Sequence, residues 1–458
     1  MSRRTGQDKT GKQFVIVAKV LLYATGTSLH VNHDLCPPET KLMTWKERIL
    51  LLLLASINFT HILDFMIMMP LGNFLMPYFH IDAQQFSVVV ASYSISAAVS
   101  GFGAAFFVDK FDRKKVLLFG YTGFIIGTIC CGIAPTYSLL LISRIVAGLF
   151  GGLIGAQVFS IIADSFAYER RGQAMGTIFS AFSLASIIGV PFSLYLAESI
   201  SWHAPFIFIG ILGIIIIPLV ARFMRPMNEH LREGKKDNPI QVLKNVVSSR
   251  LQLTALALSG CLMLGHFLII PFLNPYMEFN VGFTAHQRNL IYMVGGIASF
   301  VGAPVIGKLA DKYGKHRIFI IFALLSLIPI FLITNMPPIK YYYVLMVTGV
   351  WFMLSTGRGI PAQAIISNVV APEQRGSFMS FNSCIQQLFT GAASLIAGMV
   401  IVVGADNKLL HYSWTGYISI GVVLLCVFIA AKIPGRSAPH AISKKESQRT
   451  VEGKKIVV

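Results

Sequence analysis

Twelve long runs of apolar residues constrain this chain more than any other feature. A helix of about 20 residues crosses a hydrocarbon core of ~30 Å. No run shows the alternation of barrel strands, and only helices and closed barrels satisfy the backbone in lipid. The sequence therefore predicts an all-α integral membrane protein of twelve spanning helices. The runs cover residues 49–72, 86–108, 116–134, 137–163, 174–199, 204–223, 251–276, 289–310, 318–336, 341–369, 378–403 and 414–433.

Composition and charge support a membrane protein. The chain is 55% hydrophobic and 13% charged, whereas soluble domains carry about 25% charged residues. The net charge of +18 comes from basic residues in short loops and at the ends, and a nucleic-acid partner would need a basic face on a soluble domain. The six cysteines have no CxxC or metal-ligand spacing. We therefore expect no nucleic acid, metal or disulfide framework.

The distribution of Lys and Arg predicts the orientation. Basic residues lie at 46–48, 110–115 and 170–171 and in the central loop and tail, whereas residues 74–85 and 135–136 carry none. Because basic loops stay in the cytoplasm, both termini are expected to be cytoplasmic. The predicted location is the cell inner (plasma) membrane, with multiple passes.

The chain divides into five segments. Residues 43–223 and 251–433 form two six-helix halves, 224–250 a central cytoplasmic loop and 434–458 a basic cytoplasmic tail. Residues 1–42 form a polar, amphipathic extension, and Met43 begins a second plausible start just before the first span. Two interpretations of this extension stay open: a misassigned start, or an arm on the membrane surface. The intact mass of the native protein would distinguish them.

An internal repeat relates the two halves. Asp109 and Lys110 follow the second span, and Asp311 and Lys312 follow the eighth, 202 positions later. The Arg171-Gly172 pair after the fourth span matches Arg375-Gly376 after the tenth, at an offset of 204. Two parallel repeats are typical of secondary transporters whose site lies between the halves.

These loops resemble those of the major facilitator superfamily over residues 43–433. The segment from Gly307 to Arg317 fits the family signature GxLaDrxGrkxR, whereas the first copy has Ala105 and Asp112 in place of its glycines. The resemblance implies a pseudo-symmetric bundle that transports a solute by alternating access.

Two further motifs resemble the drug:proton and sugar-efflux antiporter branch. Gly189 and Pro191 in the fifth span are similar to its GVPxGxxL pattern. Arg144 in the fourth span resembles its intramembrane arginine, with Ala147 where Gln is usual. The resemblance implies proton-linked export.

Asp64 is the predicted proton-coupling residue. A carboxylate at mid-span costs roughly 2.5 to 3.5 kcal/mol, so such acids usually face a wet cavity and function there. His61 and Asn58 precede it at three-residue steps on one helical stripe. Arg144 is expected either to pair with deprotonated Asp64 or to anchor loop carbonyls. A purely structural pair within the helix packing is the alternative.

Arg358 lies in the segment 355–361, whose glycines and Pro361 predict a helix that breaks or bends there. Interrupted helices commonly line transporter sites, so Arg358 is expected either to bind an anionic part of the substrate or to hold a kink. Further candidate cavity residues, which alternatively join helices, are Asn58, His266, Asn382, Gln386 and Gln387.

The loop acids predict a conformational latch. Carboxylates can cap helix N-termini, and by resemblance Asp109 and Arg113 would latch the halves on the cytoplasmic side, with Asp164 as the partner of Arg113. Asp311 and Arg317 of the second copy are expected to belong to the same latch. The alternative is that these charges only enforce orientation.

The predicted function is proton-coupled efflux of a small organic solute by a monomer without a cofactor. One charge moved across ~100 mV provides about 2.3 kcal/mol, or roughly a fifty-fold gradient. Proton-coupled uptake is the first alternative. A membrane enzyme using His61 and Asp64 lacks any accompanying nucleophile, metal or phosphate motif, and a receptor that binds without transport is the other alternative. The sequence does not identify the substrate.

Overall fold

The computed structural model describes residues 43–166, 168–228, 244, 246–370, 375–404 and 406–434. The extension 1–42, most of the central loop and the tail from residue 435 onward, about which the sequence made predictions, lie outside these residues. The arrangement below is that within residues 46–458.

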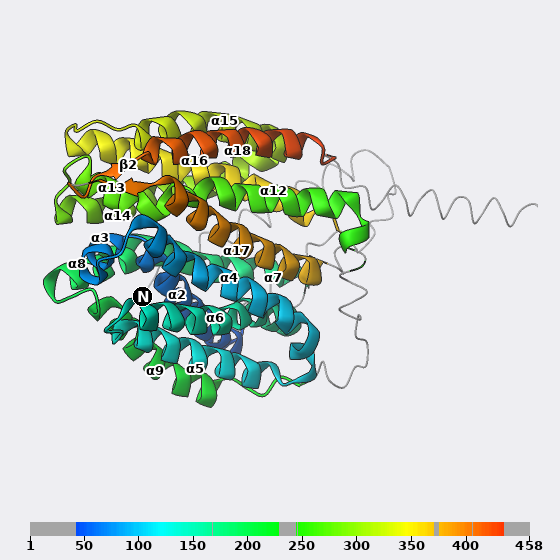
Figure 1. The fold of residues 1–458 in the computed structure, drawn as a ribbon. Helices are drawn as coiled ribbons and strands as arrows, with labels where there is room; N and C mark the ends of the chain where they lie inside the picture. The colour runs from blue at the N-terminus through cyan, green and yellow to red at the C-terminus, as the bar shows by residue number, and fades with distance from the viewer. Residues whose placement is uncertain are drawn as a thin grey trace, which may run out of the picture. The chain divides into compact units, whose positions relative to one another are not determined.

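Seventeen helical elements and one short hairpin build the described chain, all drawn in Figure 1 along the colour ramp. The N-terminal half contains α2 (Trp45–Met68), α3 (Gly72–Phe79), α4 (Ala83–Phe107), η2 (Val108–Lys110), α5 (Arg113–Gly132), α6 (Tyr137–Ser165), α7 (Tyr168–Leu184), the π-helical turn η3 (Ala185–Gly189), α8 (Val190–Ser199) and α9 (Ala204–Phe223). The C-terminal half contains α12 (Arg250–Phe267), α13 (Ile270–Phe279), α14 (Ala285–Tyr313), α15 (Lys315–Thr334), α16 (Tyr341–Ser367), α17 (Arg375–Val400) and α18 (Tyr412–Ala431). Between α17 and α18, strands β1 (Val402–Val403) and β2 (Leu409–Leu410) pair antiparallel.

The predicted all-helical membrane fold is confirmed. Eleven helical segments among the described residues are long and apolar enough to cross a membrane. Helix α16, 27 residues long, covers the tenth predicted span but is not one of the eleven.

The first and seventh spans differ from the prediction. The first was expected to run to residue 72, but α2 ends at Met68, and a separate helix, α3, lies mostly within residues 74–85, which were expected to form a loop. The seventh, predicted as continuous, is divided into α12 and α13 at Leu268. A proline lies at each division: Pro70 precedes α3, and Pro271 occupies the first turn of α13. Proline lacks an N–H and fits a helix start, where that donor has no partner.

The interruption predicted in the tenth span is absent. Helix α16 continues through Gly357, Arg358 and Pro361, so of the two predicted alternatives, a break or a bend, the break was wrong. The neighbouring α15 packs against this segment, since a Cβ on Gly357 would meet the Phe322 ring. Neighbouring helices commonly stabilise a proline inside a membrane helix.

The two copies of the repeated loop turn by different means. Asp112, which replaces a family glycine, is the N-cap of α5 and accepts a hydrogen bond from the Lys115 amide at 3.1 Å. In the second copy Gly314 adopts a positive φ of 96° between α14 and α15, where a side chain would be strained. A capping carboxylate and a glycine thus end the same loop differently.

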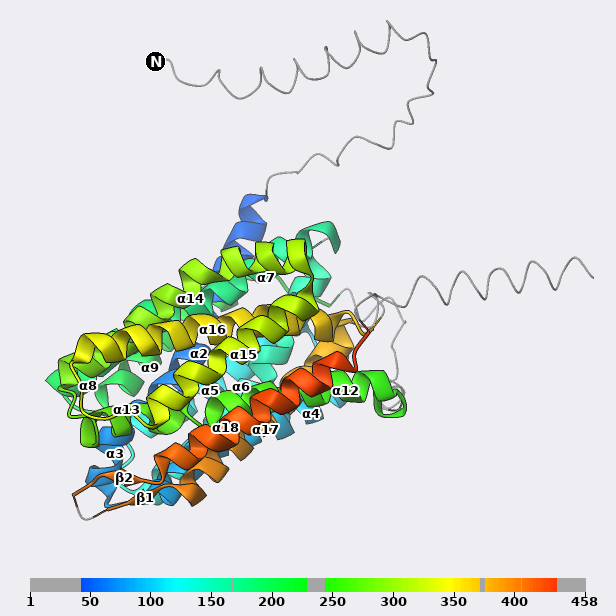
Figure 2. The same ribbon diagram turned by 90° about the horizontal axis from the view of Figure 1, so that it is seen from above.

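Each half is a bundle packed on small residues. A Cβ on Gly148 or Gly152 of α6 would meet the α4 backbone at Tyr93 or Ala97, so the two helices approach closely. The halves meet where α4 packs on α17, α14 on α7, η3 and α8, and α3 on α13. Figures 1 and 2 show α3, α8 and α13 gathered at one end, which we call the α3/α13 end.

Candidate functional site

An ion pair between Asp64 of α2 and Arg144 of α6 lies inside the N-terminal half. The distance from Arg144 Nη1 to Asp64 Oδ2 is 2.8 Å, and the two side chains are 1% and 0% exposed. The Arg144 guanidinium lies 4.4 Å from the centroid of the Tyr93 ring on α4, a cation–π contact. We call Asp64 and Arg144 the central pair.

The central pair leaves polar atoms without partners. Asp64 Oδ1, Arg144 Nε, the Tyr93 hydroxyl and His61 Nε2 are buried and make no hydrogen bond within the described chain. Because buried polar groups are normally bonded, this cluster has the capacity to receive a proton, water or a ligand atom.

His61 lies next to the central pair. Its ring centroid is 6.2 Å from that of Tyr93 and 5.4 Å from that of Phe124. Gly151 leaves room for it, since a Cβ there would lie 2.9 Å from His61 Nε2. On α6, Gly148 therefore makes space for α4 and Gly151 for the histidine.

Asn58, predicted on the same stripe, joins two helices. Its Nδ2 donates to the backbone carbonyl of Ile178 on α7 at 3.2 Å. The structure thus places Asn58 in a helix contact, the alternative given for it.

The antiporter-like motif lies where the fifth span packs on α2. A Cβ on Gly189 would lie 2.8 Å from Leu63 Cδ1 of α2. Pro191 lies in the first turn of α8.

Arg358 in the C-terminal half is 3% exposed and donates to Ser326 Oγ at 3.2 Å. His266 stacks on Trp351 with ring centroids 5.0 Å apart. His266 Nδ1 and Trp351 Nε1 are buried without partners among the described residues. Arg358, His266 and Trp351 form a polar cluster on α12 and α16.

The other predicted cavity residues all lie on α17. Asn382 is fully buried, and both its amide atoms lack a partner in the described part of the chain. Gln386 Nε2 donates to Ser259 Oγ on α12 at 2.9 Å, and Gln387 is half-buried.

The predicted latch is only partly described. Arg113 Nε of α5 lies 3.0 Å from Asp164 Oδ2 of α6, the partner that the resemblance implied, but both residues belong to the N-terminal half, so this pair does not itself join the halves. The side chain of Asp109 is outside the description. Asp311 and Arg317 are exposed and form no ion pair with another described residue.

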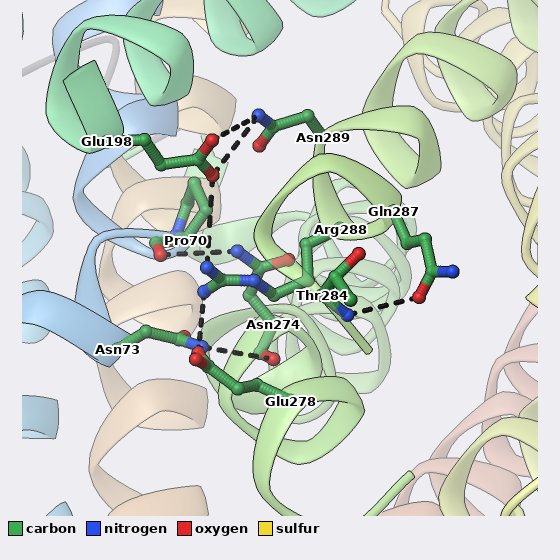
Figure 3. A network of polar contacts seen from close by, with 9 residues as sticks. All are labelled: Pro70, Asn73, Glu198, Asn274, Glu278, Thr284, Gln287, Arg288 and Asn289. Atoms are coloured by element: carbon green, nitrogen blue, oxygen red, sulfur yellow. Dashed lines mark hydrogen bonds and ion pairs between the residues drawn. The ribbon is translucent and has the colours of Figure 1, made fainter. Parts of the chain in front are cut away.

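A polar network at the α3/α13 end joins the halves and was not predicted (Figure 3). Arg288 of α14 contacts Glu278 of α13 at 2.6 Å and Glu198 of α8 at 3.8 Å. Asn289 Nδ2 donates to both carboxylate oxygens of Glu198 at 3.2 Å, and Asn73 of α3 donates to Glu278. Each carboxylate is therefore bonded by an amide from the opposite half. We call this set the interhalf network: Asn73, Glu198, Asn274, Glu278, Arg288 and Asn289.

A repeated sequence would have revealed part of this network. Pro70 and Asn73 recur as Pro271 and Asn274 at an offset of 201. In the structure Asn274 Nδ2 donates to the Pro70 carbonyl at 3.2 Å, and Asn73 Nδ2 donates to the Asn274 carbonyl at 3.5 Å. Equivalent positions of the two repeats thus bond to each other where the halves meet (Figure 3).

Two proteins of known sequence are similar to this chain over most of its length. The chain is 24% identical over 356 residues to the MFS-type transporter YceJ of Bacillus subtilis (strain 168), covering 76% of this chain and 88% of that protein. It is 26% identical over 390 residues to Multidrug resistance protein 3 of the same organism, covering 71% and 74%.

Solved structures share the fold. A bacterial homologue of the human lysosomal transporter Spinster, in an inward-facing and occupied conformation, superposes with a TM-score of 0.67 at 13% identity, covering 87% of this chain and 100% of that one. The D-xylose–proton symporter gives 0.67 at 16%, covering 85% and 98%. The family model for the Major Facilitator Superfamily matches residues 54–265 and 255–457. With two such matches, which together cover both halves, the chain belongs to the major facilitator superfamily of membrane transporters.

Proposed function

We propose that this transporter exports a small organic solute in exchange for protons, with Asp64 as the proton carrier. The buried central pair carries the proposal. Removal of a carboxylate from water favours its protonated form, whereas the adjacent Arg144 favours the charged form. These opposed effects leave Asp64 able to change its charge when the surroundings of Arg144 change.

The pair lies next to the contact between halves. Phe65, which follows Asp64, packs on Phe267 of α12 with ring centroids 5.7 Å apart, and Phe267 follows His266. A movement of the C-terminal half relative to α2 would thus alter the surroundings of the pair. Alternating access by rocking of two halves is the mechanism common to such repeats.

The direction of export rests on two observations. The Gly189–Pro191 motif resembles the antiporter branch, and one relative is named a multidrug resistance protein. Proton-coupled uptake is the second candidate, favoured by the fold shared with a D-xylose–proton symporter.

The proposal includes twelve spans with cytoplasmic termini in the plasma membrane, acting as a monomer with no cofactor. Under this orientation the α3/α13 end faces the outside, because it includes residues 74–85, which carry no Lys or Arg. The interhalf network would close the outer side, whereas the Arg113–Asp164 pair lies within the N-terminal half and would hold α5 to α6.

Proton movement in inverted vesicles tests the proposal. We expect candidate solutes to collapse an imposed pH gradient with the parent chain but not with Asp64→Asn. Asp406→Asn, which removes an exposed carboxylate from the loop before α18, is the matched control and should behave as the parent. Equal activity of Asp64→Asn and parent would show that the proton is carried elsewhere, and proton movement only when the solute gradient points inward would favour uptake.

A further inference from the structure

Four arginines are buried among the described residues: Arg113, Arg144, Arg288 and Arg358. The first three each form an ion pair with a carboxylate. Arg358 has only the neutral hydroxyl of Ser326. A buried charge is costly unless it is paired, so the exception within this set of four requires a partner of negative charge.

The described membrane interior does not provide that charge. Asp64, the fully buried carboxylate, is already bonded to Arg144 in the other half. Arg144 and Arg358 carry two positive charges and Asp64 carries one negative charge. One positive charge, that of Arg358, therefore has no counter-charge in this region of the described chain.

Unpartnered polar atoms lie on the same face of α16 as Arg358. Trp351, Ser355 and Arg358 follow one another at four- and three-residue steps on α16 and share one face. Trp351 Nε1 and Ser355 Oγ are buried and make no hydrogen bond to described residues. His266 of α12 stacks on Trp351 and presents the unpartnered Nδ1.

Aromatic surface adjoins these polar groups. Trp351 is stacked on His266 at 5.0 Å, and Phe267 reaches Phe65 of the N-terminal half. Flat apolar surface beside a few convergent donors is typical of sites for small organic molecules.

We propose that the cluster formed by His266, Trp351, Ser355 and Arg358 binds the anionic group of an organic solute, a carboxylate or sulfonate on an aromatic or other apolar body. Arg358 provides the charge, since guanidinium matches such planar or forked anions. Trp351 Nε1 donates a hydrogen bond, and Ser355 Oγ donates or accepts one. This inference rests on the proposed function, of which it names the substrate class.

Binding to the purified full-length protein in detergent tests the proposal. The probes are benzoate and toluenesulfonate, each paired with its neutral analogue, benzamide and toluenesulfonamide. Thermal unfolding is the first readout. Tryptophan fluorescence is the second, because Trp351 is one of only four tryptophans. Trp351→Phe identifies its share of the signal when it is measured at anion concentrations at which thermal unfolding shows that this variant still binds.

At least one anion is expected to raise the melting temperature and change the fluorescence, with little effect of the neutral analogue. Arg358→Gln should weaken anion binding roughly tenfold or more, as expected for loss of a charged hydrogen bond. Arg358→Lys, which keeps the charge if Gln impairs folding, should retain the preference for the anion with a smaller loss. Arg250→Gln, an exposed arginine at the start of α12, is the control and should bind as the parent.

The proposal is overturned if neither anion acts, if the neutral analogues act equally, or if binding is unchanged in Arg358→Gln. Failure of the proton-exchange function would look different: the anions would bind with the Arg358 dependence but would move no protons. Conversely, if the protein exchanges protons but binds the anions and their neutral analogues equally, only the proposed anionic substrate class is overturned, and the proposed function stands.

Discussion

The central pair and the interhalf network are each built around a buried arginine, but they differ in what they join. Asp64 and Arg144 both belong to the N-terminal half, whereas Arg288 of the C-terminal half contacts Glu198 of the N-terminal half. When two halves rock as units, a contact within one half persists, but a contact between halves must break. The first arrangement therefore suits a change of protonation, and the second a change of position.

The carboxylates of the central pair and of the interhalf network also differ in their exposure to water. The central carboxylate is 0% exposed, whereas Glu198 and Glu278 are 21% and 32% exposed. Charges in contact with water are screened more strongly than buried charges. The interhalf network can thus separate into water at moderate cost, while the central pair cannot be separated without leaving a buried charge.

The largest expected effect comes from breaking the contact between halves with Arg288→Gln. Truncation of one partner of a buried charge pair costs about 2 kcal/mol or more, which here would shift the balance towards an open outer side roughly thirty-fold. The measurement is labelling by a membrane-impermeant thiol reagent from the extracytoplasmic side. The reporter is Tyr292→Cys, one turn beyond Arg288 on α14 and buried, in a chain whose six native cysteines are replaced by serine.

Two variants sharpen this measurement. Lys408→Gln removes an exposed charge near β2 and should leave labelling unchanged. Glu198→Gln should raise labelling, and combined with Arg288→Gln it should add less than its separate effect, because both remove the same contact. Unchanged labelling in Arg288→Gln would mean that the network does not close the outer side.

A smaller effect is expected from loosening the half that holds the central pair. In Gly148→Ala the new Cβ would meet the Tyr93 backbone, so α4 and α6 must separate. Overpacking of this kind typically costs about 1 to 3 kcal/mol, which should lower the melting temperature and weaken proton coupling together.

Gly155 provides the control on the same helix. A Cβ there would meet nothing within 4 Å, so Gly155→Ala should keep or slightly raise stability, since alanine favours helix. If the two substitutions had equal effects, close packing of α4 on α6 would not be what holds the central pair.

The smallest expected effect concerns the repeated asparagines. Asn274→Ala removes the bond to the Pro70 carbonyl, and the loss of one buried hydrogen bond costs about 1 kcal/mol. Labelling of Tyr292→Cys should therefore rise roughly five-fold, less than with Arg288→Gln. Gln84→Ala, which removes an exposed amide near the start of α4, should not change labelling, and a similar rise with that control would argue against a specific role of Asn274.

Much of the fold was predictable because the signals are local. A long apolar run must span as a helix in lipid, and the helices begin and end within a few residues of the predicted runs. The divisions at Pro70 and Pro271 were missed because a proline inside an apolar run is compatible with a continuous membrane helix. The same ambiguity led to the wrong prediction of a break at Pro361, where α15 packs closely and α16 continues.

The candidate site was predicted less completely. Asp64 and Arg144 stand out because charges are rare in apolar runs. An acidic and a basic residue that both lie within such runs suggest each other as partners. Glu198, Glu278 and Arg288 lie at the ends of runs, where charges are common, so nothing marks them as contacts between halves. The repeated Pro-x-x-Asn pattern at residues 70–73 and 271–274 was the one available signal.

The sequence by itself determined the membrane helices, their division into two related halves and the residues whose charge in an apolar run requires compensation, because each depends on hydrophobicity and repetition along the chain. Only the tertiary structure decided which charges are compensated. It pairs Arg144 with Asp64, places Arg288 between two carboxylates and leaves Arg358 with a neutral hydroxyl. A side chain's partner depends on how helices distant in sequence pack and rotate against each other, and no local pattern encodes that rotation.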